Sequence, residues 1–226
     1  MELLTPQQFK SAIYLDFEGE GNARGDSEIK KPHLAGIYTP RHQDRKEMYR
    51  CVCFKENWKP ICNGVAKAEV GDFKEFFSTL AEQVKQNDQY IVFWTVHEPL
   101  LLDEFLSQAL VKKLRPHLYN LHPPARKYLN RLKRFGADGS AKGKSLEECF
   151  AALKLKREPF PPFPLGPAEA CRRIDRACKK NKKWRHFSDP QKGYAKDLVR
   201  YNYGDCKATW LIAKRIGNFF ASLKKT

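Results

Sequence analysis

Two acidic side chains, Asp16 and Glu18, stand at the end of an apolar run, SAIYLDFEGEG at 11–21. Apolar and β-branched residues of this kind predict a buried strand, and strand alternation then points both carboxylates to the same face. Two carboxylates this close repel each other unless a cation lies between them. The pair therefore predicts ligands for a hard divalent metal ion. The alternative is an ordinary strand that ends in a solvated acidic turn.

A second candidate position lies near the other end of the chain, in the segment 197–220. Its apolar residues recur at helical spacing and predict a long amphipathic helix. Tyr201 and Asp205 are four residues apart, so a phenol and a carboxylate lie one turn apart on the same side of this helix. The two groups can converge on one point, which favours the metal-site interpretation of the first strand.

Together, the two segments resemble the first and third motifs of the DEDD-type nucleases of the ribonuclease H-like superfamily. These motifs are an Asp-x-Glu on the first strand and a Tyr-x-x-x-Asp on the last helix. The chain looks closest to the ribonuclease H-like domain of YprB-like and RecB-associated proteins, where a YN..DC.AT..L helix is characteristic, and it has YNYGDCKATWLI at 201–212. The resemblance implies the Tyr branch of these 3′–5′ exonucleases. It also implies an α/β fold, with a mixed sheet of three antiparallel strands followed by parallel strands, flanked by helices.

The elements that must position these residues are predicted from periodicity. Apolar runs at 33–38 and 49–54 predict two more strands, which with the first strand open an antiparallel sheet. A capped helix with an apolar stripe is predicted at 72–84. The buried run 89–96 then predicts a strand that is parallel to the first, because a helix separates the two.

Glu98 stands where the strand at 89–96 meets the next helix, with Pro99 at the first helical position. In the family that the chain resembles, the second acidic motif lies at such a junction. The resemblance therefore implies Glu98 as a further ligand, with Asp103 as the reserve candidate. Many DEDD nucleases have Asp here, whereas the RecB-associated branch often has Glu. The alternative is a first-turn residue that is favourable to the helix dipole.

The length of 226 residues and a hydrophobic content of 42% predict one sizeable core, and so a single domain over 1–226. The sequence has neither an apolar run long enough to span a membrane nor a start that resembles a leader. We therefore expect no membrane partner and a cytoplasmic location. The cysteines are odd in number, seven, and their spacing fits zinc poorly, which predicts buried free thiols.

The net charge of +16 is concentrated in one part of the chain. The range 107–186 has 21 Lys and Arg against 6 Asp and Glu, and the rest has 21 against 20. A basic surface beside an acidic metal site suits an enzyme that cleaves phosphodiesters, because the first holds the polyanion and the second activates water. The excess coincides with a basic helical and Pro-rich insertion predicted at about 112–190. The alternative is a solvated basic face.

Two basic helices are predicted in this insertion. In 126–135, aromatic and apolar residues alternate with basic ones. This pattern suits either a helix that binds nucleic acid or an ordinary helix in which the aliphatic parts of Lys and Arg lie along the core. The helix at 168–184 ends in CKKNKKWRHF and is the preferred nucleic-acid contact. A turn at 188–193 is predicted before the final helix. The candidate nucleic-acid-binding residues are Arg126, Lys127, Arg131, Arg134, Lys179, Lys180, Lys182, Lys183, Trp184 and Arg185.

The resemblance implies a two-metal mechanism. In it, two Mg²⁺ or Mn²⁺ ions would be held by four carboxylates and Tyr201 would orient the attacking water, giving 3′–5′ exonucleolytic hydrolysis of DNA or RNA. A competing hypothesis is a module of the same fold that binds nucleic acid but does not catalyse its cleavage. A third is a phosphatase of small nucleotides, against which the extended basic surface argues. The four expected ligands are Asp16, Glu18, Glu98 and Asp205.

Overall fold

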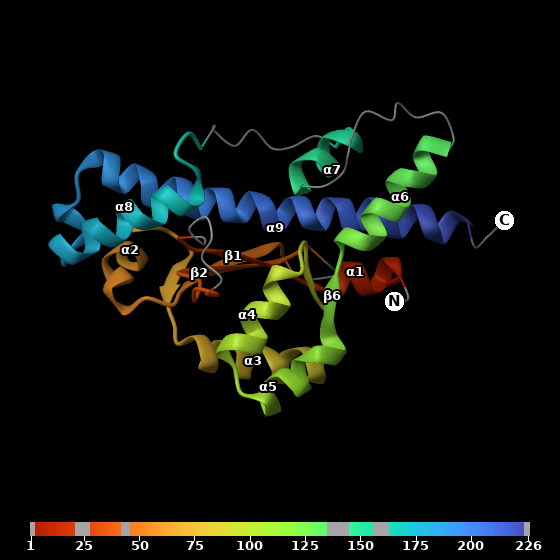
Figure 1. Cartoon of the computed structure of the whole chain (residues 1–226), viewed down its shortest axis with the longest axis horizontal. Helices are drawn as coiled ribbons and strands as arrows, with labels where there is room; N and C mark the ends of the chain where they lie inside the picture. The colour runs from red at the N-terminus through yellow and green to blue at the C-terminus, as the bar shows by residue number, and fades with distance from the viewer. Residues whose placement is uncertain (1–2, 21–27, 42–45, 135–144, 156–162, 224–226) are drawn as a thin grey trace.

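The computed structural model describes residues 3–20, 28–41, 46–134, 145–155 and 163–223. A mixed sheet lies between two groups of helices, which confirms the predicted α/β class (Figure 1). In chain order, with η for 3-10 helices, the elements are α1 (Pro6–Ser11), β1 (Ile13–Glu18), β2 (Leu34–Thr39), β3 (Met48–Cys53), η1 (Glu56–Trp58), α2 (Lys59–Gly64), β4 (Ala68–Val70), α3 (Phe73–Gln86), β5 (Ile91–Phe93), α4 (His97–Phe105), α5 (Gln108–Leu114), η2 (Arg115–His117), β6 (Leu118–Asn120), α6 (His122–Arg134), α7 (Leu146–Ala152), α8 (Gly166–Lys180), η3 (Trp184–His186) and α9 (Asp189–Leu223).

The sheet has six strands in the order β4-β3-β2-β1-β5-β6. β1, β2 and β3 are antiparallel, and β5 and β6 run parallel to β1, as predicted for three antiparallel strands followed by parallel ones. β4 pairs with β3 in parallel at one edge and was not predicted. β6, at the other edge, lies inside the range 112–190 that was predicted as an insertion.

Strand alternation divides the residues of β1 between the two faces of the sheet. Ile13 and Leu15 pack with the core beneath α3, α4 and α5, whereas Tyr14 packs beneath α9. The ring of Tyr14 lies 5.6 Å from that of Trp210 on α9, measured between centroids. Because Asp16 and Glu18 continue the Tyr14 side of the strand, both carboxylates face α9.

The cap predicted for the helix at 72–84 is confirmed. The Asp72 side chain caps α3 by accepting hydrogen bonds from the backbone N–H groups of Lys74 and Glu75, at 2.8 and 3.0 Å. The strand predicted at 89–96 is wrong in its length, because only Ile91–Phe93 pairs within the sheet. The chain bends after it and enters α4 at His97. The bend brings Glu98 to the end of the sheet.

The final helix α9 is 35 residues long and begins at Asp189, so the predicted turn at 188–193 is wrong. The Ser188 backbone N–H donates to the Gln191 side chain at 2.9 Å, and the Gln191 backbone N–H donates to the Ser188 hydroxyl at 3.5 Å. This reciprocal pair is a capping box. Pro190 fits the first turn, where a missing N–H costs little. The turn-like composition of the segment therefore concealed a helix start.

All seven cysteines are free thiols, and six of them are buried, as predicted. Within the described ranges, no helix combines the length and the apolar character needed to cross a membrane. The Gly-rich connection predicted at 136–144 and the first half of the proline-rich bridge predicted at 158–167 lie outside the described residues. At its other end the predicted bridge is wrong, because α8 begins at Gly166.

Candidate metal centre

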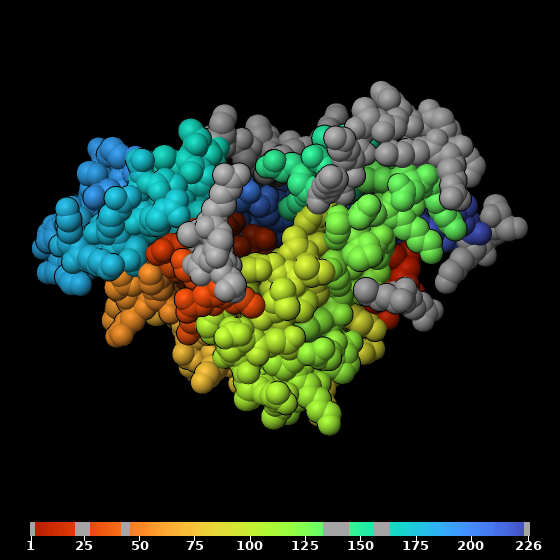
Figure 2. Space-filling view, in the orientation of Figure 1, coloured from red at the N-terminus to blue at the C-terminus, as the bar shows by residue number. Residues whose placement is uncertain are grey.

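Three of the predicted ligands meet between β1 and α9. Asp16 and Glu18 point from β1 toward the helix, and Asp205 lies on α9 opposite them. The three side chains offer carboxylate oxygens that are no more than 4.8 Å apart. In Figure 2 the surface is recessed near this position, where parts of β1 and α9 are seen between α8 and α4. Carboxylates drawn from opposite ends of the chain thus form one group.

Carboxylates of this group have a raised pKa because they are buried close together. Burial, and then the charges of Glu18, Asp205 and Glu98, raise the pKa of Asp16 well above its usual range. Burial and the charge of Asp205 likewise raise the pKa of Glu18. A divalent cation would reverse both effects by stabilising the ionised carboxylates. Hard oxygen donors of this kind fit Mg²⁺ or Mn²⁺.

Glu98 lies beside the three carboxylates but outside their 4.8 Å group. It is 5% exposed, and its Oε2 accepts a hydrogen bond of 2.7 Å from the Thr95 hydroxyl. Its charge contributes to the raised pKa of Asp16, so the two groups are electrostatic neighbours. Asp103, the reserve candidate, is instead paired with Arg115 at 2.8 Å on the surface, with a side chain that is 46% exposed. Of the two, Glu98 is the one near the centre.

Tyr201 lies one helical turn before Asp205 and donates a hydrogen bond to its carboxylate. Burial, and then the charges of Asp205 and Glu18, raise the pKa of the Tyr201 phenol. The phenol therefore keeps its proton near neutral pH and acts as a hydrogen-bond donor. Its ring lies 5.6 Å from that of Phe163, which precedes α8.

Sequence reasoning missed Asn202, whose side chain is fully buried beside the carboxylates. Its Nδ2 donates to Oδ2 of Asp16 at 2.7 Å, and it also hydrogen-bonds Glu18. Its Oδ1 accepts a hydrogen bond of 2.8 Å from the Tyr49 hydroxyl on β3. The sequence did contain a signal for Asn202, since it follows Tyr201 directly in the 201–212 motif. Only Tyr201 and Asp205 of this motif were given a role from the sequence.

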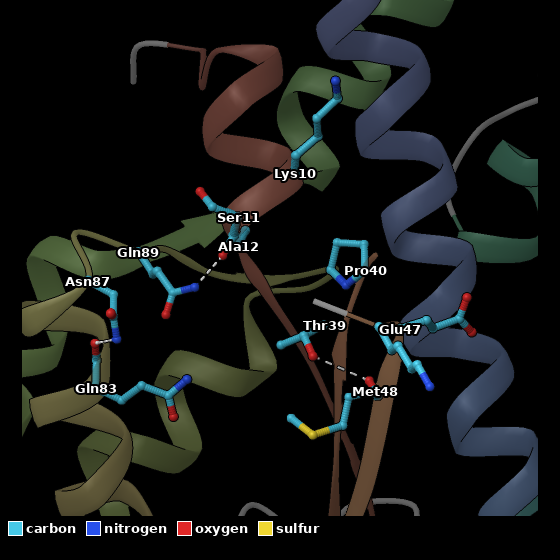
Figure 3. Close-up of a pocket in the computed structure, with 11 residues that line it drawn as sticks. Lys10, Ser11, Ala12, Thr39, Pro40, Glu47, Met48, Gln83, Asn87 and Gln89 are labelled. Carbon is cyan, nitrogen blue, oxygen red and sulfur yellow. Dashed lines mark hydrogen bonds between the residues drawn. The ribbon is translucent and has the colours of Figure 1, made fainter. Parts of the chain in front are cut away.

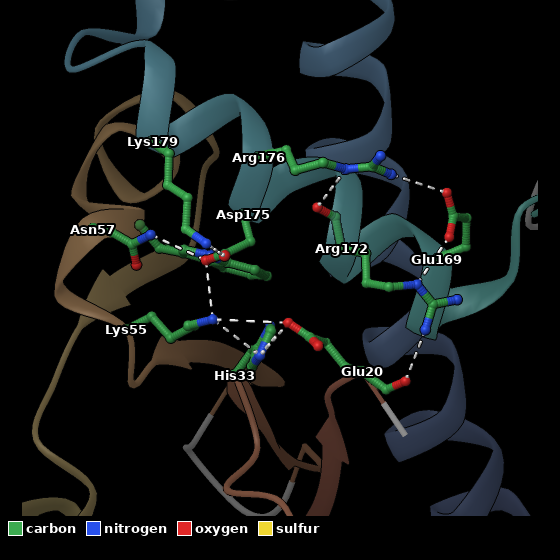
Figure 4. A network of polar contacts seen from close by, with 10 residues as sticks. Glu20, His33, Lys55, Asn57, Glu169, Arg172, Asp175, Arg176 and Lys179 are labelled. Carbon is green, nitrogen blue, oxygen red and sulfur yellow. Dashed lines mark hydrogen bonds and ion pairs between the residues drawn. The ribbon is translucent and has the colours of Figure 1, made fainter. Parts of the chain in front are cut away.

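A network of ion pairs attaches α8 to the sheet end that carries the carboxylates (Figure 4). Asp175, which is 6% exposed, lies 2.9 Å from Lys55 Nζ and 3.1 Å from Lys179 Nζ. Burial alone would raise the pKa of Asp175, but hydrogen bonds from Asn57, Lys55 and Lys179 lower it below its usual range. Arg172 of α8 also donates to the backbone oxygen of Glu20, just after β1, at 3.2 Å. Helix α8 is therefore fixed close to the metal centre.

The predicted nucleic-acid-binding residues fall into two groups, at opposite ends of α9 (Figure 1). The first lies on α6, where Tyr128 contacts Phe219 of α9 with ring centroids 4.6 Å apart. The second follows α8, where Arg173 lies over the ring of Tyr194 at 5.4 Å. Tyr194 and Phe219 are about 38 Å apart along a regular helix. Asp205 lies between them.

Within each group, some side chains already have partners inside the protein. Lys179 is paired with Asp175, and the Arg131 guanidinium lies 5.2 Å from the ring centre of Phe220. Trp184 packs so closely against α2 that a Cβ added at Gly64 would lie 2.0 Å from its indole. The Arg134 side chain lies outside the described residues. The candidate basic residues that are exposed are Arg126, Lys127, Lys179, Lys180, Lys182, Lys183 and Arg185.

A separate cavity of about 610 Å³ lies at the other end of β1, away from the carboxylates (Figure 3). Ser11, Thr39, Met48 and Gln83 are among its lining residues. The Gln89 amide donates to the Ser11 backbone oxygen on one wall of this cavity. None of the candidate ligands lines it, so it is not part of the metal centre.

Comparisons with protein-family models, with curated proteins and with solved structures found no match. The features that indicate a function are therefore the sheet topology and the chemistry of the grouped side chains.

Proposed function

We propose that this chain is a metal-dependent nuclease with a ribonuclease H-like fold, related to the DEDD-type enzymes of the Tyr branch. One observation carries the proposal: Asp16, Glu18 and Asp205 offer oxygens within 4.8 Å of one another, although they come from opposite ends of the chain. The sheet supports it, since three antiparallel strands are followed by strands parallel to the first. The predicted resemblance requires both features.

In this mechanism each residue has a defined task. Asp16, Glu18 and Asp205 would hold one divalent cation, and Glu98 would contribute to binding a second. Bound Mg²⁺ or Mn²⁺ would supply the acidity that activates water and would stabilise the leaving 3′ oxygen. The Tyr201 hydroxyl, which keeps its proton, orients the attacking water. The reaction is hydrolysis of a phosphodiester bond, with 3′–5′ exonucleolytic cleavage as the expected form.

The substrate in this proposal is DNA or RNA. The exposed basic residues after α8 and on α6 lie on either side of the carboxylates along α9 (Figure 1). A polyanion that contacts both groups would run along α9, which carries Asp205 between them. A small nucleotide needs no such extent of positive charge, so the phosphatase hypothesis has less support.

The test uses labelled single- and double-stranded DNA and RNA, incubated with the purified chain in Mn²⁺. We expect cleavage by the parent and a loss of at least about 10³-fold in Asp16→Asn and Asp205→Asn, because each removes a metal ligand. Tyr201→Phe should retain metal binding and lose about 10²-fold in rate, since it removes only the hydroxyl. Asp103→Asn, which removes an exposed carboxylate of the same type, is the matched control and should cleave like the parent.

A second candidate is a nucleic-acid-binding module of the same fold without turnover. It is favoured by the position of Glu98, which lies outside the group of three carboxylates. If the parent shifts nucleic acid in a gel but cleaves nothing in Mg²⁺ or Mn²⁺, the binding module is supported and the nuclease proposal is overturned.

A further inference from the structure

The Asn202 amide is held at both ends in the fully buried space between α9 and the sheet. Nδ2 donates to Asp16 twice, to the side-chain Oδ2 at 2.7 Å and to the backbone oxygen at 3.3 Å. Oδ1 accepts the Tyr49 hydroxyl hydrogen at 2.8 Å. The Tyr49 hydroxyl also lies 3.2 Å from the backbone oxygen of Val199, one turn earlier on α9. The amide therefore links β1, β3 and α9.

The two ends of the amide require one orientation. If the amide turned over, Oδ1 would face the Asp16 carboxylate, and two acceptors would then oppose each other in a buried site. The Tyr49 hydroxyl would at the same time lose its best acceptor. Asp16 therefore selects this orientation of Asn202, and in it the Tyr49 hydroxyl makes its shorter hydrogen bond, to Oδ1 at 2.8 Å rather than to the Val199 backbone oxygen at 3.2 Å.

A glycine on β2 provides the space for this side chain. Gly36 is the register partner of Asp16 across β1 and β2. A Cβ at position 36 would lie 1.6 Å from Oδ1 and 2.7 Å from Cγ of Asn202. Both atoms belong to a buried amide that is fixed by hydrogen bonds, so neither can move away cheaply. Any larger residue at position 36 must displace Asn202.

We propose that Asn202, oriented by Tyr49 and accommodated by Gly36, is a positioning residue that fixes the Asp16 carboxylate for cation binding. With Oδ2 engaged by the amide, the other oxygen of Asp16 is the one presented to the ion. Groups that orient a metal ligand in this way change metal affinity by about 10–100-fold when they are removed. This inference depends on the metal-binding part of the proposed function and adds Tyr49, Asn202 and Gly36 to it.

The test measures Mn²⁺ affinity directly, from the electron paramagnetic resonance signal of free Mn²⁺, without substrate. We expect Asn202→Ala to weaken binding about 10–100-fold. Gly36→Ala should weaken it in the same way, although it leaves every ligand and the amide chemically intact. Tyr49→Phe should have a smaller effect, because it releases the amide without removing it. Tyr203→Phe is the matched control: its hydroxyl donates to Glu47 at 2.6 Å and its ring contacts Tyr49, and the substitution leaves the Tyr49 and Asn202 side chains unchanged.

A second measurement separates a loss of Mn²⁺ affinity caused by misfolding from one caused by a displaced Asn202 side chain. In the metal-free protein, the side-chain amide resonances of Asn202 should move in Tyr49→Phe and stay in place in Tyr203→Phe. Parent-like Mn²⁺ affinity in folded Asn202→Ala and Gly36→Ala proteins overturns the positioning role while leaving the nuclease proposal intact. A parent that binds no Mn²⁺ overturns the metal centre itself, and the positioning role with it. A parent that binds Mn²⁺ but does not cleave overturns only the nuclease activity.

Discussion

The Asp16 carboxylate lies among three other acidic groups in the folded chain. Its pKa is raised by burial and then by the charges of Glu18, Asp205 and Glu98. The Asn202 amide donates a hydrogen bond of 2.7 Å to its Oδ2, which favours the ionised form. Without a cation, the repulsion among the charged carboxylates is a cost to the folded state.

Neutralising Asp16 should stabilise the metal-free protein. A raised folded-state pKa gives stability that is present below the unfolded pKa, about 3.9 for Asp, and lost as pH rises through the folded value. In EDTA near pH 7 we therefore expect Asp16→Asn to unfold about 2–4 °C above the parent, or about 1 kcal/mol. The difference should shrink toward pH 4. Thermal unfolding across this pH range is the measurement.

Stability in Mn²⁺ distinguishes the relief of repulsion among the carboxylates from a change in stability that is unrelated to cation binding. The parent should gain stability in Mn²⁺, whereas Asp16→Asn should gain much less, because it has lost a ligand. A parent that is as stable as the variant at every pH, or equal gains in Mn²⁺, would contradict a charged cluster built for a cation.

Individual site residues differed in how far the sequence could predict them. Asp16, Glu18, Tyr201 and Asp205 follow from alternation along one strand and from spacing along one helix, which are local rules. Asn202 depends on how closely α9 approaches β2, and this depends in turn on the absence of a side chain at position 36. No periodicity within a single element contains that information.

At the scale of elements, α8 is attached to the sheet through Asp175. The carboxylate lies within hydrogen-bonding range of Lys55, Asn57 and Lys179, and its own side chain is 9% exposed. The Asp175 carboxylate is buried, whereas its partners Lys55 and Lys179 are 31% and 70% exposed. Breaking this pair should cost more than breaking a fully exposed pair, because one partner is shielded from water. The attachment holds α8 beside the strand end that carries the candidate metal ligands.

Removing the Asp175 charge should loosen this attachment. We expect Asp175→Asn to lower the free energy of unfolding by about 2–3 kcal/mol near pH 7. The folded-state pKa of Asp175 is lowered, so its contribution is present above the unfolded pKa of about 3.9 and is lost as pH falls through the folded value. Urea unfolding should therefore show a difference from the parent that decreases in acid.

Asp103→Asn is the matched control for Asp175→Asn, because it breaks an exposed pair with Arg115. Surface pairs contribute about 0–1 kcal/mol, so we expect little change in unfolding. Equal losses in the two variants would show that Asp175 does not act as a buried anchor.

The elements that the sequence did not predict are either too short to show periodicity or begin with residues that are typical of turns. β4 and β6 are three residues long, too short for alternation to identify them. The start of α9 was hidden because Ser188, Pro190 and Gly193 are typical turn residues, although Ser188 and Gln191 form a capping box. Longer elements with clear periodicity, such as β1 and α3, were predicted within a few residues.

At the scale of the whole molecule, the positive charge is divided rather than continuous. One group of exposed basic residues lies at the end of α8 and after it, and the other lies on α6. Tyr194 and Phe219, the α9 residues that contact these two helices, are about 38 Å apart along α9. The sequence showed one basic third of the chain, and it could not show that the fold would place its two helices at opposite ends of α9. In the proposed function, a nucleic acid that contacts both groups must be long enough to reach from one to the other.

This separation predicts how affinity depends on salt and on length. Each phosphate contact that is lost should reduce the slope of log K against log salt by about 0.7–0.9. For a long DNA duplex and the Asp205→Asn protein, we expect Lys182→Gln with Lys183→Gln to reduce the slope by about 1.8, and Arg126→Gln with Lys127→Gln to do the same. At about 3.4 Å per base pair, the separation of about 38 Å between Tyr194 and Phe219 corresponds to about 11 base pairs. An oligonucleotide of half this length reaches one group only, so its slope should respond to only one of the two double substitutions.

The contradicting outcomes are equally clear. If both double substitutions alter the slope equally for short and long nucleic acids, or if neither alters it, the nucleic acid does not cross the metal centre from one basic group to the other.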